Sequence, residues 1–354
     1  MRIQPGVAPL HIYFLLILSS GLVNHVLIIP VILSASGRDA WISILISIVP
    51  YLLFILLIGS VLKKIGTKSF TTYIKERIGV TPYYLISAIF ILYFYLNAII
   101  TFRDTITWTK TNYLPDSPAL ALGLLLGTLC LAATYKGLQD LAIVSIFILP
   151  IVGALGIFIA IGNFQHKDYS MLLPIAEHGW TPIVKGSAYA MSGLSELCTL
   201  LFLAHSTNRK LKWRHIFLVA FILMGLMLGP TMAAIAEFGP YEANNLRYPA
   251  FEQWKLLTIS KEITRMDFLS IFQWISGAFI RISLLMLLVL KLINIKKHKI
   301  WIVIALYGSA IAYALAPLSN ITIFHFLYDY FFPIQLFIII PFVVLISLIV
   351  LLKK

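Results

Sequence analysis

The chain has 354 residues, of which 60% are hydrophobic and only 12% are charged, and its mean hydropathy is +0.94. Soluble domains carry about 25% charged residues, so this composition excludes a water-soluble fold and predicts one transmembrane domain, 1–354, made of apolar helices. The net charge of +13 comes from short basic clusters between apolar runs, which membrane topology explains without any nucleic-acid partner.

Apolar runs of about 20 residues, the length that crosses a lipid bilayer as a helix, recur from one end of the chain to the other. We predict an all-α integral membrane fold with about ten transmembrane helices. The first five spans, at 9–33, 40–62, 83–106, 119–134 and 141–161, form a segment 8–162. The second five, at 183–203, 216–236, 268–292, 300–317 and 331–352, form a segment 183–352.

The basic residues between the spans predict the orientation. If the N-terminus is cytoplasmic, most of them fall on the cytoplasmic side, as the positive-inside rule requires, so we expect both termini to be cytoplasmic. No small-residue cleavage site follows the first span, which is expected to stay in the protein. The residues that carry this argument are Arg2, Lys63, Lys64, Lys68, Lys75, Arg77, Lys136, Arg209, Lys210, Lys212, Arg214, Lys291, Lys296, Lys297, Lys299, Lys353 and Lys354.

Two of the loops carry more pattern than a simple connector. Residues 68–79 place Phe70, Tyr73, Ile74 and Ile78 at helical spacing, which predicts a short amphipathic helix on the cytoplasmic face. The outer loop 237–267 is the longest and mixes acidic, basic and aromatic residues. We expect either a lid or partner-docking surface there, or an ordinary capped loop.

The sequence contains no signature of a soluble enzyme. There is no Gly-rich phosphate loop, no HExxH and no Cys pair at metal-ligand spacing, so we expect no enzymatic activity, no catalytic residue, no metal and no cofactor. Cys130 and Cys198 both lie inside apolar segments and are expected to be small core residues.

Small and polar residues gather at mid-depth in the first span, at 19–25, and in the sixth, at 191–196, and both segments contain Ser-Gly-Leu. Because five spans per segment is an odd number, these two spans run in opposite directions. The pattern predicts an inverted repeat with broken helices 1 and 6, since glycine eases unwinding and unwound backbone is tolerated only beside a cavity or ligand. The alternative is close helix packing through small residues, which we also expect at Gly123, Gly127, Gly225 and Gly229.

Ionisable side chains within the spans mark a possible site, because each is costly in a bilayer. Glu196 and Arg281 both lie near mid-depth, and we hypothesise that Arg281 either pairs with Glu196 or replaces a coupling cation against the first span. Arg103 and Asp104 lie near the outer end of their span and are expected to act as gate or anchor residues that reach the interface. The candidate ligand-binding residues are Ser20, Gly21, Asn24, His25, Tyr95, Asn97, Gly193, Ser195 and Glu196.

A series of short motifs runs along nearly the whole chain. The motifs are Arg38-Asp39-Ala40-Trp41, Leu114-Pro115-Asp116-Ser117-Pro118, Lys136-Gly137-Leu138-Gln139-Asp140, Leu172-Leu173-Pro174 with Gly179, the segment from Gly193 to Glu196, Phe238-Gly239, Tyr248-Pro249, and Arg265-Met266-Asp267 leading to Trp274. In these motifs and their order the chain resembles one family, the B subunits of bacterial spore germinant receptors.

This resemblance implies a fold of the amino acid-polyamine-organocation transporter superfamily, in which ten helices form a LeuT-like 5+5 inverted repeat. It also implies that the protein senses a small nutrient germinant (an amino acid, sugar or nucleoside) at the inner membrane of a spore. The implied partners are an A-type membrane subunit and a lipid-anchored C-type subunit.

A second function fits the same architecture. A proton- or cation-coupled amino acid permease, located in the bacterial cell membrane and using Glu196 or His25 as its coupling group, needs the same broken helices and buried charges. Gradient-driven uptake by this chain alone distinguishes the permease from a receptor subunit that requires its partners.

Overall fold

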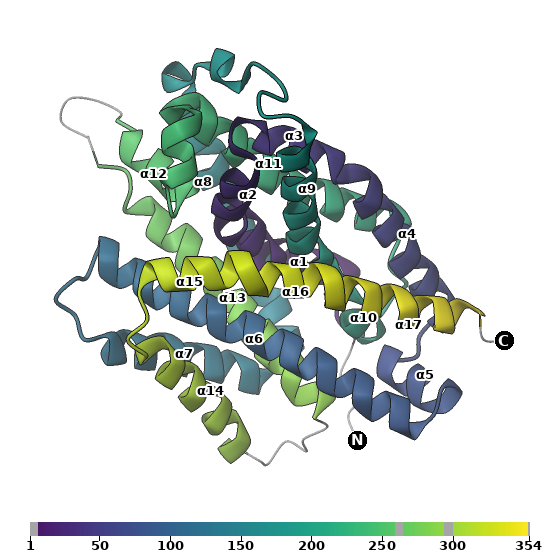
Figure 1. Ribbon diagram of the computed structural model, residues 1–354. Coiled ribbons are helices and arrows are strands. Elements are labelled where there is room, and N and C mark those ends of the chain that lie inside the picture. Colours follow the sequence, from purple (N-terminus) through teal and green to yellow (C-terminus); the bar gives the residue numbers. More distant parts are fainter. Residues whose placement is uncertain (1–5, 259–264, 294–299, 353–354) are drawn as a thin grey trace.

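The apolar runs of the sequence fold as helices in the computed structural model, which describes residues 6–258, 265–293 and 300–352 (Figure 1). Within these residues the β-type pairing is limited to one isolated parallel bridge, between Val7 and Thr207. Both chain ends lie outside the described residues, as do several basic residues on which the orientation prediction rests, namely Arg2, Lys296, Lys297, Lys299, Lys353 and Lys354.

The first half of the chain forms eight α-helices. They are α1 (Pro9–Leu22), α2 (Ile29–Ser36), α3 (Ala40–Ile46), α4 (Ile48–Ile65), α5 (Phe70–Arg77), α6 (Val80–Asn112), α7 (Ala119–Lys136) and α8 (Leu138–Gly162). A π-helical turn, Val23–Leu27, lies between α1 and α2, and a 3-10 turn, Gly37–Asp39, lies between α2 and α3.

The second half begins with α9 (Trp180–Leu194), the 3-10 turn Ser195–Thr199, α10 (Leu200–Leu203) and the 3-10 turn Ala204–Ser206. It continues with α11 (Trp213–Asn245), α12 (Pro249–Leu256), α13 (Leu269–Leu292) and α14 (Ile300–Leu315). The last long segment contains α15 (Asn320–Phe326), α16 (Phe332–Ile334) and α17 (Ile340–Leu352), joined by the π-helical turns Leu327–Phe331 and Gln335–Ile339.

Among the described residues, eight helical segments are long and apolar enough to cross a membrane. One of them, Pro9–Ile65, contains the first two predicted spans, and α14, with 16 residues, is a shorter apolar helix. The prediction of an all-helical integral membrane protein is therefore confirmed. The ten-helix inverted repeat, with its segments 8–162 and 183–352, stays a prediction.

Helix α13 lies at the centre of the packing. It contacts α1, α6, α7 and α8, and most of its side chains from Ser276 onward are buried. Helix α9 packs against α2 and α3 (Figure 1). A side chain at mid-depth on α13 is therefore surrounded mainly by helices of the first half of the chain.

Large apolar side chains cover much of the outside of the protein. Examples are Leu125 on α7, Phe147 and Ile157 on α8, and Phe337 in the π-helical turn before α17, the last with 73% of its surface exposed. A water-soluble protein does not leave so many large apolar side chains uncovered. These surfaces are the ones that lipid covers.

The predicted amphipathic helix at 68–79 is confirmed as a helix by α5, whose apolar residues Phe70, Tyr73 and Ile74 are buried. Helix α6 is longer than its predicted span of 83–106. Its 33 residues extend about 50 Å at 1.5 Å per residue, which exceeds a hydrocarbon core of about 30 Å. Helix α6 is therefore long enough to cross the apolar layer at a tilt or to extend beyond it.

The outer loop predicted at 237–267 is largely helical in its described part. Helix α11 runs on to Asn245 across a kink at Gly239, whose φ of 77° suits glycine, and Pro240 follows directly. Helix α12 comes next and packs against α11. Much of the predicted loop is thus a structured cap over the end of the bundle.

The glycines differ in what surrounds them. A Cβ at Gly127 would lie 3.2 Å from Ile311 on α14, which supports the predicted packing role there. At Gly225 and Gly229 a Cβ would meet nothing within 4 Å, so the packing role predicted for these two is wrong. They lie on an exposed face of α11, where no other described residue comes within 4 Å of the added Cβ.

Candidate functional site

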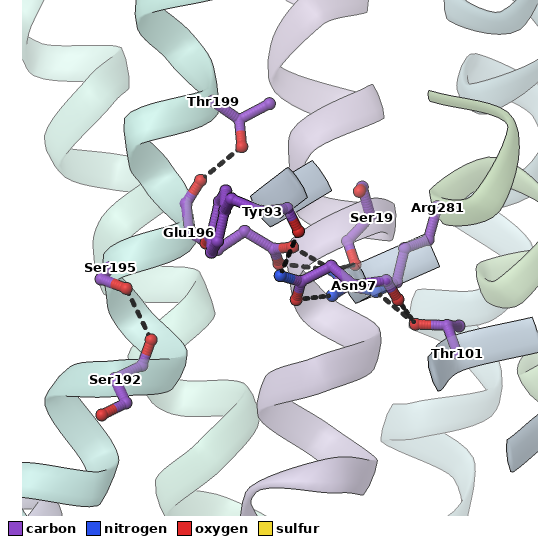
Figure 2. A network of polar contacts seen from close by, with 9 residues as sticks. All are labelled: Ser19, Tyr93, Asn97, Thr101, Ser192, Ser195, Glu196, Thr199 and Arg281. Atoms are coloured by element: carbon purple, nitrogen blue, oxygen red, sulfur yellow. Dashed lines mark hydrogen bonds and ion pairs between the residues drawn. The ribbon is translucent and has the colours of Figure 1, made fainter. Parts of the chain in front are cut away.

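The Arg281 guanidinium lies at the centre of a buried polar network. Its side chain projects from α13, and the residue is completely inaccessible to solvent. Glu196, which is 2% exposed and lies in the 3-10 turn after α9, forms an ion pair with Nη1 of Arg281. Figure 2 shows the two side chains pointing toward each other between α1 and α6. The structure thus places both mid-depth charges of the sequence in one contact.

Three further groups bind the guanidinium. Nε donates to Thr101 Oγ1 at 2.8 Å, Nη2 donates to Asn97 Oδ1 at 2.9 Å, and Nη1 donates to the Ser19 carbonyl at 3.2 Å. The partners come from α6, α1 and the turn after α9, so Arg281 joins four separate helical segments. A buried charge persists when it is both paired and hydrogen-bonded in this way.

Helix α6 contributes two side chains to the network, and the helical repeat places both on one face. Asn97 and Thr101 lie four residues apart and therefore on one face of the helix. The Asn97 amide donates to the Tyr93 carbonyl at 2.9 Å and Thr101 Oγ1 donates to the Asn97 carbonyl at 2.8 Å, which fixes the side chains that meet Arg281. Sequence reasoning missed Thr101 and Ser19. The four-residue spacing from Asn97 is a signal that points to Thr101.

Close to the network, buried polar atoms lack partners. Ser20 Oγ and both side-chain atoms of the Asn24 amide are buried and form no hydrogen bond. Both residues lie on the same face of the first span, and a Cβ built on Gly193 would lie only 2.7 Å from Asn24 Oδ1. The structure therefore brings the 19–25 and 191–196 segments together at this point.

Gly21, His25 and Tyr95 lie apart from the network, whereas Ser195 lies within it, next to Glu196. The His25 ring Nδ1 lies 3.2 Å from the Leu226 carbonyl of α11, and Gly21 also faces Leu226. The Tyr95 hydroxyl lies 2.6 Å from Ser309 Oγ on α14, on the other side of α6. Ser195 Oγ donates to the Ser192 carbonyl one turn earlier (Figure 2).

The predicted breaks in helices 1 and 6 take another form. Helix α1 continues through Gly21 and α9 continues through Gly193, so the prediction of unwound backbone at these glycines is wrong. The first span changes to a π-helical turn at Val23–Leu27 and the sixth to a 3-10 turn at Ser195–Thr199. A change of helix type keeps backbone groups paired within the chain, whereas unwinding in lipid does not.

The change of helix type makes a backbone group available to Arg281. The Val23 N–H donates to the Ser20 carbonyl rather than to that of Ser19, four residues earlier, and the Ser19 carbonyl accepts from Arg281. The positive charge thus lies against the first span just before its π-helical turn. This is the placement hypothesised for a residue that replaces a cation.

At the outer end, Arg103 and Asp104 are buried, which corrects the expectation that they reach the interface. Arg103 donates to the Leu318 carbonyl at 2.8 Å. Asp104 accepts from Arg247 at 2.7 Å and from the Tyr248 hydroxyl at 3.0 Å, so it holds the segment leading into α12. The partners of Asp104 are side chains of the cap, whereas the partner of Arg103 is a backbone carbonyl after α14, and sequence spacing reveals neither.

A family model described as "Spore germination protein" matches residues 9–319 of the chain. The chain belongs to the spore germination protein family. The similarity extends over nearly the full length: spore germination protein XB of Bacillus anthracis is 40% identical over 326 residues, which cover 92% of each chain.

More distant members of the spore germination protein family match over a shorter region. Spore germination protein KB of Bacillus subtilis (strain 168) is 23% identical, covering 71% of this chain and 69% of that protein. Putative spore germination protein YfkT of the same strain is 24% identical, with coverage of 72% and 70%. The family resemblance seen in the sequence is therefore confirmed, and a germination-related role follows from it.

Proposed function

We propose that this protein is the B subunit of a germinant receptor, which binds a small nutrient germinant in the middle of the membrane and helps to trigger spore germination. The observation that carries the proposal is the set of unpartnered atoms on Ser20 and Asn24. Each buried polar group without a partner costs about 1–3 kcal/mol. A ligand that supplies the missing hydrogen bonds recovers this energy.

The neighbouring network restricts the chemistry of the ligand. All three guanidinium nitrogens of Arg281 already have partners, and Glu196 is engaged with Arg281. A carboxylate ligand has to compete with Glu196 for this charge. Ser20 and Asn24 offer a hydroxyl and an amide, which suit neutral hydroxyl, carbonyl or amide groups such as those of sugars, nucleosides and polar amino acids.

The signal follows from the position of the network. Arg281 holds four helical segments from both halves of the chain, so ligand contacts on the first and sixth spans bias any relative movement of those segments. We place the subunit in the spore inner membrane with both termini cytoplasmic, beside A-type and C-type receptor subunits. Its ten helices form the LeuT-like 5+5 arrangement in this proposal, and no catalytic step is involved.

The test is ligand-induced thermal stabilisation of the purified chain, measured with a panel of amino acids, sugars and nucleosides. A ligand at 100 times its Kd stabilises the folded state by about 2.7 kcal/mol. We expect one ligand class to raise the Tm, and Asn24→Ala to abolish the shift while the protein stays folded. Tyr95→Phe is the matched control, because its hydroxyl contacts Ser309 away from Asn24.

An unchanged ligand shift in Asn24→Ala contradicts the proposed site. No shift with any compound moves the sensing site to another subunit. The permease alternative predicts a different result. Gradient-driven amino acid uptake into vesicles that contain this chain alone contradicts the receptor assignment. Loss of that uptake in Glu196→Gln then identifies Glu196 as the coupling group.

A further inference from the structure

A cavity of about 300 Å³ opens at the end of the molecule where α5, α10 and the last turn of α13 meet, away from the Arg281 network. Its described lining residues are Phe70, Thr71, Phe202, His205, Leu288, Lys291 and Leu292. Figure 1 shows α5 and α10 at the same end as the end of α17, beside the first turns of α6. The Ser20 and Asn24 site does not share any of these residues.

The floor of this cavity is apolar and rigid. Phe70 and Phe202 pack edge to face with ring centroids 5.3 Å apart, and both rings are buried. Leu288 of α13 is buried beside them. Phe202 also packs against Phe90 of α6 at 4.6 Å, so the floor is anchored to the core of the bundle.

The mouth of the cavity is basic. Lys291 and His205 are solvent-exposed residues on different elements, and no acidic side chain occurs among the described lining residues. The Lys291 ammonium has no hydrogen bond or ion pair within the described part of the chain, and His205 Nε2 lies 3.5 Å from Ser206 Oγ. On α5 the one carboxylate, Glu76, is paired with Lys68 at 2.5 Å. Lys291 therefore gives the cavity mouth an uncompensated positive charge, and His205 adds an imidazole beside it.

The segments next to the cavity add to this charge. Lys75 and Arg77 lie on α5, and Arg209, Lys210 and Lys212 follow the turn that carries His205. By the positive-inside rule, this basic end faces the cytoplasm. The cytoplasmic leaflet is rich in anionic lipid, and each Lys or Arg near its surface contributes about 1 kcal/mol of attraction.

We propose that this cavity binds an anionic phospholipid, with Lys291 and His205 on the phosphate and with Phe70, Phe202 and Leu288 against its apolar part. The apolar floor beneath an ammonium and an imidazole matches a ligand that has an anionic head on a hydrocarbon body. A free phosphate ion provides the head without the body and leaves the aromatic floor unused. Lipid bound here connects α5 to α13, the helix that carries Arg281.

The experiment uses the full purified chain in detergent and three soluble probes: dihexanoyl phosphatidylglycerol, dihexanoyl phosphatidylcholine and inorganic phosphate. The readout is the concentration dependence of the Tm shift. We expect phosphatidylglycerol to give a saturable shift, with an apparent Kd about five-fold weaker in Lys291→Gln, the factor that corresponds to one surface cation. Phosphatidylcholine, which has no net charge, is expected to bind more weakly.

Lys210→Gln is the matched control, since it removes a charge from the same end but does not line the cavity. If inorganic phosphate alone gives a saturable shift, and Lys291→Gln weakens that shift as much as it weakens the phosphatidylglycerol shift, the site binds a free anion. This result overturns the lipid proposal. Equal weakening by Lys291→Gln and Lys210→Gln, or no shift that depends on Lys291, overturns the cavity as the site. In the last case the cations remain available to an acidic segment of a protein partner.

Discussion

At Arg281 the cost of taking a guanidinium out of water is offset by groups from three other helical segments. The contacts with Glu196, Asn97 and Thr101 are all made by side chains, and Ser19 adds a backbone carbonyl. Removing one partner of such a buried pair leaves the other charge without compensation, which typically costs about 3–5 kcal/mol. The network therefore stabilises the fold only as a complete set.

We expect Arg281→Met to lower the free energy of unfolding by about 3–5 kcal/mol, because Glu196 is then buried alone. Glu196→Gln should destabilise for the same reason, since it leaves the Arg281 charge unpaired. The double variant should lose less than the sum of the two single losses, because no unpaired charge remains. Thermal unfolding of the four proteins closes this double-mutant cycle, and additive losses would show that the two side chains are not coupled.

At this scale the sequence identifies charged residues more reliably than their uncharged neighbours. Glu196 and Arg281 stand out because ionisable residues within apolar runs are rare and costly. Polarity predicts Tyr95 and Asn97 as site residues alike, yet two positions along a helix turn a side chain through roughly 200°. That rotation directs Tyr95 to Ser309, while Thr101, four positions on from Asn97, faces Arg281.

At the scale of elements, the ends of the helices were less predictable than their existence. The apolar runs predict where helices form, because hydrocarbon leaves backbone groups few other solutions. The π-helical turn at Val23–Leu27 and the 3-10 turn at Ser195–Thr199 depend on contacts between spans. The Ser19 carbonyl, for example, is bound by an arginine 262 residues further along the chain.

Close packing of α9 against α2 and α3 gives a test at this scale. A Cβ on Gly186 would lie 2.5 Å from both Ser36 Oγ and Ser43 Oγ, and each serine is held by a hydrogen bond within its own helical segment. We expect Gly186→Ala to lower the free energy of unfolding by about 1–3 kcal/mol through overpacking.

Gly153 on α8 provides the matched control for this substitution. A Cβ there meets nothing within 4 Å, so Gly153→Ala should be neutral or should stabilise the protein by up to about 1 kcal/mol through helix propensity. Thermal unfolding of both variants in the same detergent makes the comparison. Equal effects at the two positions would show that the helices separate easily at Gly186.

At the scale of the whole molecule, charge predicts orientation while packing does not. Glu177 belongs to the predicted outer side, where it pairs with Arg38 at 2.9 Å, and Lys210 belongs to the basic inner end. We expect a membrane-impermeant maleimide to label Glu177→Cys from outside the cell and Lys210→Cys only in inverted vesicles. The background is low because Cys130 and Cys198 are both buried. The reverse labelling pattern would invert the proposed topology.

The arrangement of the helices relative to one another could not be predicted from the sequence. Composition and hydropathy predict an all-helical membrane protein because they report the solvent that each segment requires. They carry no information on which helix lies beside which, and the cap formed by the end of α11 and α12 rests on Asp104, Arg247 and Tyr248, which are distant in sequence. Such contacts are set by the folded chain as a whole.

The short pairing between the start of the first span and the end of the sixth has a consequence for evolution. Val7 N–H donates to the Ser206 carbonyl at 2.9 Å, and Asn208 N–H donates to the Val7 carbonyl at 3.0 Å. Both bonds are made by the main chain, so side-chain changes at 7 or 208 leave the bonding groups in place, and proline, which lacks the N–H, does not. Relatives can therefore vary widely at the exposed position 208, and among apolar residues at the buried position 7, and still keep the two spans connected.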